Sequence, residues 1–263
     1  MKCAILISLY NAEKTLDETF KSLKRQTFQD FRIIAINDHS TDQTLSLLKK
    51  WQEKMGKDRF IIIDNEDNIG LTKSLNKGLY QITEPYTARI DADDTWNTTK
   101  LEKQIAYLEK YPKCDIVGTW YKNISSKGEK KVTLPITDAD IKKSLFKRNP
   151  FAHSCVVFRT ELVKEAGYYD ASIRYGQDYE LWMRLLPKTN FANIPEFLCS
   201  RNTENTLTSS GKNQRAQMLQ CIQTQLKYLK LYERPIAEYR FVIEPFLVAI
   251  APEWLRTLKR NFF

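Results

Sequence analysis

Apolar runs of strand length and helical segments alternate along the first hundred residues. The runs cover residues 3–9, 31–36, 60–63 and 86–90, and each is followed by apolar residues at helical spacing. The connections are short, which favours parallel strands joined by right-handed crossovers. The pattern therefore predicts an α/β fold with a Rossmann-like, mostly parallel central sheet flanked by helices.

The alternation becomes less regular after Pro112. Strands are expected at residues 115–121, 131–134, 151–158, 191–194 and 197–200, and helices at 138–147, at 160–166 and from 175–180 onward. Residues 202–212 are rich in Ser, Thr and Asn without periodicity and are expected to form a mobile loop. Residues 214–263 are largely helical in pattern, with breaks expected at Pro235, Pro245 and Pro252.

Three polar sites are candidates for helix N-caps. Asn11 follows the first strand and can cap the first helix. Residues 40–43 have the S-x-x-Q form of a capping box for the second helix. Asp94 or Asn97 can cap the helix after the fourth strand.

Charge restricts the classes of partner. The chain has 41 Lys and Arg against 32 Asp and Glu, a net charge of +9, and its basic excess is concentrated after residue 211. Basic residues are not interleaved with aromatics in a nucleic-acid-binding module, so no nucleic-acid partner is expected. An anionic lipid, an anionic substrate or a solvated basic surface each fits the charge. Residues 254–263 mix aromatics with cations, which suits either a peripheral membrane contact or docking onto the protein itself.

Cysteine usage and hydropathy indicate the compartment. The five cysteines are odd in number, and no pair has zinc-ligand spacing, which is typical of a reduced cytosolic protein. We expect no signal peptide, because Met1-Lys2 leads directly into the first strand. The best membrane-span candidate, residues 241–251, is too short and contains Glu244 and Pro245. A cytoplasmic protein, with peripheral contact to the inner face of the membrane as a hypothesis, is therefore expected.

Carboxylates crowd the end of the fourth strand. Asp91, Asp93 and Asp94 lie within four residues directly after it. Ligands bind at this edge of an open α/β sheet, and carboxylate oxygens suit Mg²⁺ or Mn²⁺. An acidic turn that caps the next helix explains the same residues equally well. The motif alone therefore does not decide between a metal site and a capping turn.

Further polar motifs follow the other strands in order. They are Ser-Leu-Tyr-Asn at 8–11, Asn-Asp-His-Ser-Thr-Asp at 37–42, Asn-Ile-Gly-Leu at 68–71, Asp-Ala-Asp-Asp at 91–94 and Gly-Gln-Asp-Tyr-Glu-Leu-Trp at 176–182. Together they resemble the family 2 glycosyltransferases of bacterial surface-polysaccharide and lipo-oligosaccharide synthesis, over roughly residues 1–200. The resemblance implies a GT-A catalytic domain at 1–211, with a donor half at 1–97 and an acceptor half at 98–211, and a C-terminal helical extension at 212–263.

The resemblance implies a site for a nucleotide-diphospho-sugar. Asp38 would accept hydrogen bonds from uracil, or alternatively stabilises its own turn. Ser8, Tyr10 and Asn11 would line the base and ribose, and Lys73 would face the nucleotide unless it is a solvated helix lysine.

The acidic motif would complete the donor site. The resemblance assigns Asp93 as the ligand of Mg²⁺ or Mn²⁺, and Asp91 as a contact to the ribose or a metal-bound water. Ala92, between them, is assigned to the donor site as well. A divalent cation suits this reaction because the diphosphate leaving group gains negative charge.

The resemblance places Asp178 as the catalytic base of an inverting transfer, although an acid favoured by the helix dipole is the alternative. Gln177 stands where relatives usually have an acidic residue, and Asn202 follows Arg201 where many have histidine. His153 and Arg201 are expected on the acceptor or diphosphate side, with a packed core histidine as the alternative for His153.

The sequence therefore predicts a metal-dependent, hexosyl- or hexosaminyl-type glycosyltransferase that uses a nucleotide-diphospho-sugar, UDP-linked, and a glycan or glycolipid acceptor. A sugar-1-phosphate nucleotidyltransferase is disfavoured because residues 8–14 contain no glycine for a phosphate loop. The alternative that stays open is a non-catalytic, nucleotide-sugar-binding or scaffold subunit, which Gln177 favours.

Overall fold

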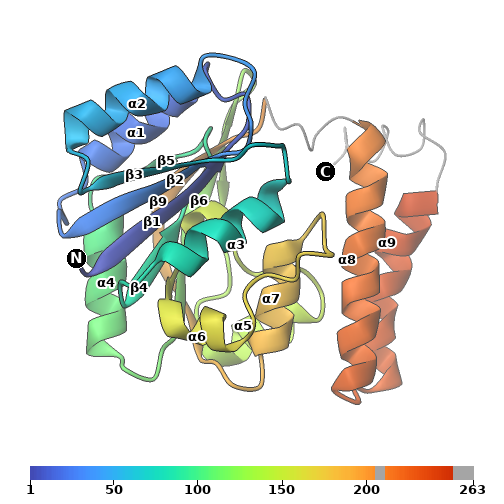
Figure 1. Cartoon of the computed structure of the whole chain (residues 1–263). Helices are drawn as coiled ribbons and strands as arrows, with labels where there is room; N and C mark the ends of the chain where they lie inside the picture. Colours follow the sequence, from blue (N-terminus) through green and yellow to red (C-terminus); the bar gives the residue numbers. More distant parts are fainter. Residues whose placement is uncertain (205–210, 251–263) are drawn as a thin grey trace.

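The computed structural model of the chain describes residues 1–204 and 211–250. Its first half alternates as predicted, with β1 (Cys3–Leu9), α1 (Leu16–Lys24), β2 (Phe31–Asn37), α2 (Thr44–Met55), β3 (Phe60–Asp64), α3 (Leu71–Gln81) and β4 (Tyr86–Arg89). The four strands pair in parallel in the order β3-β2-β1-β4 (Figure 1). This half of the sheet confirms the predicted Rossmann-like arrangement.

The second half completes a mixed sheet. Its elements are β5 (Thr95–Trp96), α4 (Lys100–Lys110), β6 (Ile116–Ser125), β7 (Gly128–Val132), α5 (Asp138–Leu145), a 3₁₀ turn η1 (His153–Cys155), β8 (Val157–Arg159), α6 (Thr160–Glu165), α7 (Gln177–Leu185) and β9 (Phe191–Asn202), followed by α8 (Gly211–Leu231), a 3₁₀ turn η2 (Ile236–Tyr239) and α9 (Arg240–Ile250). The order continues β4-β8-β6-β9-β5, and β8 runs antiparallel to both neighbours. The α/β sheet flanked by helices is confirmed, but parallel pairing dominates only its first half.

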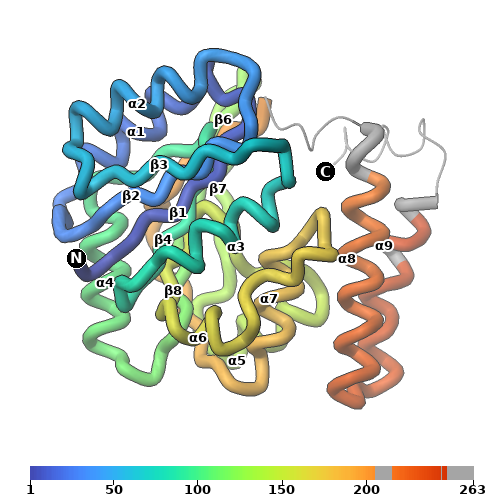
Figure 2. Tube along the Cα trace, viewed as in Figure 1, coloured from blue at the N-terminus to red at the C-terminus, as the bar shows by residue number. Residues whose placement is uncertain are grey.

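Both faces of the sheet are covered, which explains the continuous apolar runs. Cys3, Ile5, Ile7 and Leu9 of β1 belong to the core beneath α1, α2 and α4. Ala4 and Leu6 point the other way, into the core under α3, α5 and α7. Figure 2 shows α1 and α2 on one side of β1–β4 and α3 on the other.

Asn11 does not cap the first helix, contrary to the prediction. The helix begins later, with Thr15 at the N-cap position. The backbone N–H of Asn11 donates to Oγ of Ser40, and its Oδ1 accepts from the N–H of Thr41. Asn11 therefore joins the β1–α1 and β2–α2 loops, in a left-handed conformation (φ 49°) that asparagine tolerates.

The predicted capping box at residues 40–43 is also wrong. The second helix begins at Thr44, and Gln43 at its N-cap position makes no side-chain capping bond. Asp42 acts instead, because its two oxygens accept from the N–H groups of Thr44 and Glu13. Contacts between the two loops thus replace the local cap.

Later elements differ in detail from the prediction. The expected strand at 151–158 is a 3₁₀ turn followed by the short β8, and the expected strands at 191–194 and 197–200 are one strand, β9. β9 changes register with β6 around Trp120, which explains the apparent break in its pattern.

Part of the C-terminal prediction can be compared with the structure. Pro245 lies inside α9 and does not end it, so the expected break there is wrong. Residues 205–210 of the expected loop, Pro252 and the aromatic and basic segment 254–263 lie outside the described residues. Among the described helices, none has the length and apolar character needed to cross a membrane.

Gly118 of β6 permits a close approach of Asn193 on β9 and of Phe151, which precedes η1. A Cβ at this position would overlap Oδ1 of Asn193 on β9 and lie 2.7 Å from Cδ1 of Phe151. The amide of Asn193 donates to the carbonyls of Pro135 (2.7 Å) and Pro150 (3.2 Å). The missing side chain therefore lets Asn193 hold the segment that precedes η1.

We predict that Gly118→Ala lowers the free energy of unfolding by about 1–3 kcal/mol, because the added methyl overpacks a buried contact. Chemical denaturation measures the change. Ala106→Ser, at an exposed position of α4, is the control and should stay within about 0.5 kcal/mol of wild type. Equal stability of both variants would contradict the proposed constraint.

Candidate active site

The polar motifs of the first half meet at the carboxyl edge of the sheet. Leu9 at the end of β1 is in register with Asn37 at the end of β2, and β4 ends beside β1. Ser8 is half-buried at the end of β1, and Tyr10 is exposed just beyond it. This edge is where a parallel α/β sheet binds ligands.

Asp38 is buried and organises the loop that leads into α3. Its oxygens accept from the N–H groups of Ile69 (3.0 Å) and Gly70 (2.9 Å) and from the amide of Asn65 (2.9 Å). The turn-stabilising role is therefore present. The contact to uracil stays a prediction.

Lys73 is exposed on the first turn of α3. Its neighbour one turn later, Lys77, donates to Oδ1 of Asn65 at 2.8 Å and so supports the same loop as Asp38. Sequence reasoning named Lys73 and missed Lys77.

Asp91 is held by a buried cation. The guanidinium of Arg89, fully buried, pairs with one Asp91 oxygen, and Oγ of Ser154 donates to the other at 3.0 Å. Burial opposes ionisation of Asp91, but the charge and hydrogen bond of Arg89 outweigh it and lower the pKa of the carboxyl. Asp91 is therefore ionised and fixed in position, with 36% of its side chain exposed.

Asp93 carries no comparable partner among the described contacts. Burial, followed by the charge of Asp91, raises the pKa of Asp93 to about 6. Ala92, between the two acids, packs against the core beneath α1 and α2. A cation near Asp93 would relieve the repulsion between the two carboxylates.

Asp94 is not a helix cap, contrary to the prediction. It is buried, its Oδ1 accepts from the N–H of Asn202 (3.0 Å), and its Oδ2 lies 3.9 Å from Nε of Arg201. The following helix starts later, with Thr99 at its N-cap position. Asp94 thus attaches β9 to the acidic turn, residues 91–94, and places the Arg201 guanidinium beside this turn.

His153 lies in η1, close to the acidic turn. Its Nε2 shares a 2.8 Å hydrogen bond with the hydroxyl of Tyr169. Burial and the charge of Arg89 lower the pKa of His153 well below its usual range, so the ring is neutral. A neutral, hydrogen-bonded histidine can orient groups but brings no positive charge to a diphosphate.

Asp178 lies in the first turn of α7, after Gly176 in left-handed conformation. Burial raises the pKa of Asp178, and hydrogen bonds from the Tyr179 backbone and the Asn149 amide (2.7 Å) oppose the increase. Gln177 is buried beside it. An acidic residue in place of Gln177 would have to be desolvated, so the departure from the family pattern removes a buried charge and leaves Asp178 in place.

The donor set fits a divalent cation that is shared with phosphates. The described residues include no group of three or more His, Cys, Asp or Glu side chains that could form an all-protein metal cage. Mg²⁺ is commonly bound by one or two carboxylates together with substrate phosphates. Asp93, with a raised pKa and Asp91 nearby, suits that mode.

The roles of three residues of this site were not assigned from the sequence: Arg89, Ser154 and Asn149. The pairing of Asp94 with β9 was also not predicted. A lone arginine inside the apolar run 86–90 was an available signal, because a buried guanidinium requires an anion.

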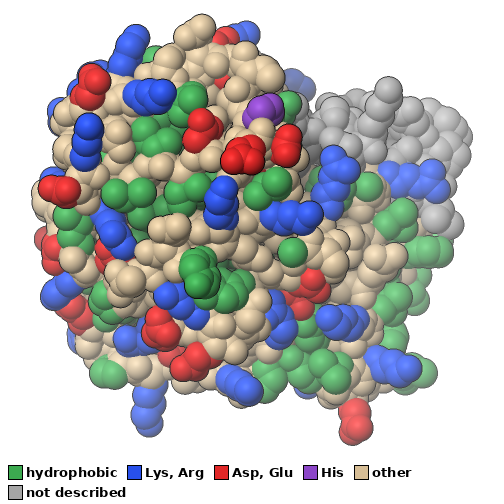
Figure 3. All heavy atoms as spheres, in the orientation of Figure 1, with side chains coloured by type: hydrophobic (Ala, Val, Ile, Leu, Met, Phe, Trp, Pro, Cys, Tyr) green, Lys and Arg blue, Asp and Glu red, His purple; other side chains and the backbone are tan. Residues whose placement is uncertain are grey.

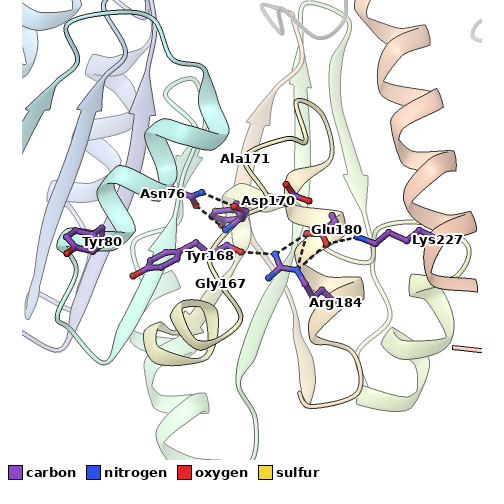
Figure 4. Close-up of a pocket in the computed structure, with 10 residues that line it drawn as sticks. Asn76, Tyr80, Gly167, Tyr168, Asp170, Ala171, Glu180, Arg184 and Lys227 are labelled. Carbon is purple, nitrogen blue, oxygen red and sulfur yellow. Dashed lines mark hydrogen bonds and ion pairs between the residues drawn. The ribbon is translucent and has the colours of Figure 1, made fainter. Parts of the chain in front are cut away.

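Among the described residues, the lining of the 590 Å³ cavity between α3, α7 and α8 (Figure 4) contains none of these carboxylates. One of its two acidic residues, Glu180, is paired with Arg184 at 3.0 Å and accepts from the hydroxyl of Tyr228 at 2.6 Å. The hydrogen bond from Tyr228 fixes α8 to α7.

Comparison with known proteins identifies the family. The model of glycosyl transferase family 2 matches residues 4–167. The amylovoran biosynthesis glycosyltransferase AmsE of Erwinia amylovora is 34% identical over 200 residues, 74% of each chain. The O-antigen biosynthesis glycosyltransferase WbnJ of Escherichia coli is 28% identical over 79% of this chain and 82% of its own.

Solved structures share the fold. S. aureus TarS 1–349 with UDP-GlcNAc has a TM-score of 0.69 at 20% identity, over 95% of this chain and 82% of that chain. TarS 1–349 with UDP has a TM-score of 0.65 at 21% identity, and the match spans 65% of that chain. The mannosyltransferase PcManGT from Pyrobaculum calidifontis, with GDP-Man and Mn²⁺, has a TM-score of 0.65 at 14% identity, over 99% of this chain and 79% of that chain. Together with the family match, these likenesses show that the chain is a member of glycosyltransferase family 2 with the GT-A fold.

Proposed function

We propose that the protein transfers a hexosyl-type sugar, with inversion, from a UDP-linked donor to a hydroxyl of a glycan or glycolipid in bacterial surface-polysaccharide synthesis. The observation that supports this proposal most is that two carboxyl groups near Arg89, those of Asp91 and Asp178, have pKa values shifted in opposite directions. Asp91 is held ionised on the donor side, whereas burial raises the pKa of Asp178 on α7. Residues 1–97 would serve the donor, 98–211 the acceptor, and 212–263 would form an extension.

Asp178 would act as the general base. It would accept the proton of the acceptor hydroxyl as that oxygen attacks the anomeric carbon from the face opposite the diphosphate. A raised pKa brings its proton affinity closer to that needed near neutral pH. Asn149 would keep the carboxylate oriented, and the neutral His153–Tyr169 pair would line the space beside it.

The acidic turn would hold the diphosphate. Asp93 would be the protein ligand of Mg²⁺ or Mn²⁺, with Asp91 positioned by Arg89 to contact the ribose. When bound, the cation supplies Lewis-acid stabilisation of the leaving diphosphate. Arg201, placed by Asp94, would add a fixed positive charge on the same side.

The nucleoside would lie over the ends of β1 and β2, against Ser8, Tyr10 and Asn11. An ionised carboxylate offers about four lone-pair sites. Asp38 uses three of them for Asn65, Ile69 and Gly70, so one remains for a uracil N–H. Lys73, exposed on α3, would approach the nucleotide from solvent.

Asp178→Asn should lower the turnover of acceptor-dependent UDP release by about 10²–10⁴-fold, because the amide cannot accept the proton. The measurement is UDP release from UDP-sugars with Mn²⁺ and an acceptor. Asp58→Asn, at an exposed position before β3, is the matched control and should retain wild-type turnover. An Asp178→Asn enzyme as active as wild type would exclude this base. Donor binding by the wild type without turnover on any acceptor would favour the scaffold alternative.

Asn149→Ala should move the acidic limb of the kcat/KM profile to higher pH. The Asn149 amide stabilises ionised Asp178, so its loss raises the carboxyl pKa further, and the base becomes protonated at a higher pH. Asn190→Ala is the control. It removes a side-chain amide hydrogen bond to the carbonyl of Lys113, at the opposite end of the sheet. An unmoved limb in Asn149→Ala would show that Asp178 does not govern the profile.

Mn²⁺ should increase the thermal stabilisation by UDP in the wild type, by about 2–4 °C for each kcal/mol of added binding energy. Asp93→Asn should lose this increment, whereas Asp178→Asn should keep it. Thermal shift with UDP, with and without Mn²⁺, measures both. If Asp93→Asn retained the full Mn²⁺ effect, Asp93 would not be the metal ligand.

A further inference from the structure

An apolar groove lies along α8 and α9 at the edge of the molecule. It has a volume of about 480 Å³ and is lined by Leu219, Ile222, Gln223, Leu226, Tyr239, Val242, Ile243 and Phe246. Ile222 and Val242 form a buried floor, whereas Leu226 and Phe246 on the rim are more than two-fifths exposed. The groove is therefore an open apolar surface of the described chain.

The opposite side of α8 is fixed to the body of the enzyme. Tyr228 bonds to Glu180, the hydroxyl of Tyr232 donates to the carbonyl of Met183 (2.7 Å), and the amide of Gln225 donates to the carbonyl of Lys147 (3.0 Å). The groove residues thus lie on the face that these bonds leave free.

Exposed apolar residues continue around α9. Ile243 and Leu247 are 57% and 56% exposed and lie one helical turn apart. Figure 3 shows hydrophobic side chains along this side of the molecule, with Lys and Arg side chains beside them. Contiguous apolar surface of this kind marks an interaction site.

Cations border the apolar face. Arg215 and Lys230 lie one turn before Leu219 and one turn after Leu226 on α8, and both are exposed. Arg240 is exposed at the start of α9, one turn before Ile243. Residues 211–250 contain six Lys or Arg and three Glu.

An apolar face with a cationic border distinguishes two possible occupants, a second copy of the chain and a lipid surface. A second copy of the chain would bring its own cations against the same cationic border, which is repulsive. An anionic lipid surface accepts the apolar residues among its acyl chains and pairs the border with its phosphates. The charge arrangement therefore favours lipid.

We propose that the α8–α9 face docks the enzyme on an anionic membrane surface. The helix that carries this face packs against the helix of the proposed base, because a Cβ on Gly176, just before α7, would lie 3.2 Å from the sulfur of Cys221, on the side of α8 that faces the body. The inference deepens the proposed function by assigning the acceptor to the lipid-linked class, whose sugar hydroxyl would reach Asp178 from the membrane.

Flotation of the full-length protein with vesicles tests the proposal. The wild type should float with phosphatidylcholine vesicles containing about one-third phosphatidylglycerol, and less with phosphatidylcholine alone. Ile243→Ser with Leu247→Ser should lower binding about tenfold, from lost apolar burial. Lys230→Glu with Arg240→Glu should lower it to a similar degree through charge.

Two matched controls should bind like wild type. They are Ile136→Ser, an exposed apolar residue far from the hairpin in sequence, and Lys49→Glu with Lys50→Glu on α2. UDP-induced thermal stabilisation without vesicles should be unchanged in the serine and glutamate variants of α8 and α9. This result separates failure of docking from failure of the donor site.

Several results would overturn the proposal. One is a wild type that does not float with anionic vesicles, or hairpin variants that float as well as it does. Another is light scattering that shows a dimer which the serine variant converts to monomer, because the face would then bind a second copy. A third is loss of flotation only on deletion of residues 252–263, because another segment would then carry the membrane contact.

Discussion

The buried guanidinium of Arg89 is the interaction on which the rest of the site depends. Carboxylates at 91, 93 and 94 repel one another at the sheet edge, and burial makes each costlier to ionise. Arg89 neutralises Asp91 from beneath, and Arg201 approaches Asp94 from β9. Among the described residues, Asp93 forms no ion pair with a cation, and it is the carboxyl at which we propose that a divalent ion binds. The antiparallel β8 follows η1, which supplies Ser154, and β9 supplies Arg201, so the mixed half of the sheet completes a site that begins in the parallel half.

The second half of the sheet, which we propose serves the acceptor, depends on a similar chain of contacts. Gly118 admits Asn193, which holds the carbonyl of Pro150, and the adjacent Asn149 holds Asp178. A glycine without a site contact thereby affects the orientation of the proposed base. The helix pair α8–α9 extends this half, because the hydroxyl of Tyr228 on α8 donates to Glu180, which lies on the same helix as Asp178. Base and docking face therefore belong to one packed unit.

The sequence predicted the parallel half well because burial on both faces leaves an unmistakable apolar run, as in residues 3–9. It could not predict that β8 inserts between β4 and β6, since such pairing depends on residues far apart in the chain. The same limit explains the site. Asp94 looked like a cap because its partners, Arg201 and Asn202, are more than a hundred positions away. Arg89 was counted within an apolar strand, although its charge was the clue to the buried ion pair.

The most direct test of this account is a crystal structure with UDP and Mn²⁺, with the metal located by its anomalous signal. If Asp93 is the metal ligand, a metal peak lies at coordination distance from Asp93 and the diphosphate. Asp91 then remains paired with Arg89, and uracil lies beside Asp38. A metal peak remote from the acidic turn, or UDP bound away from the ends of β1 and β2, would contradict it.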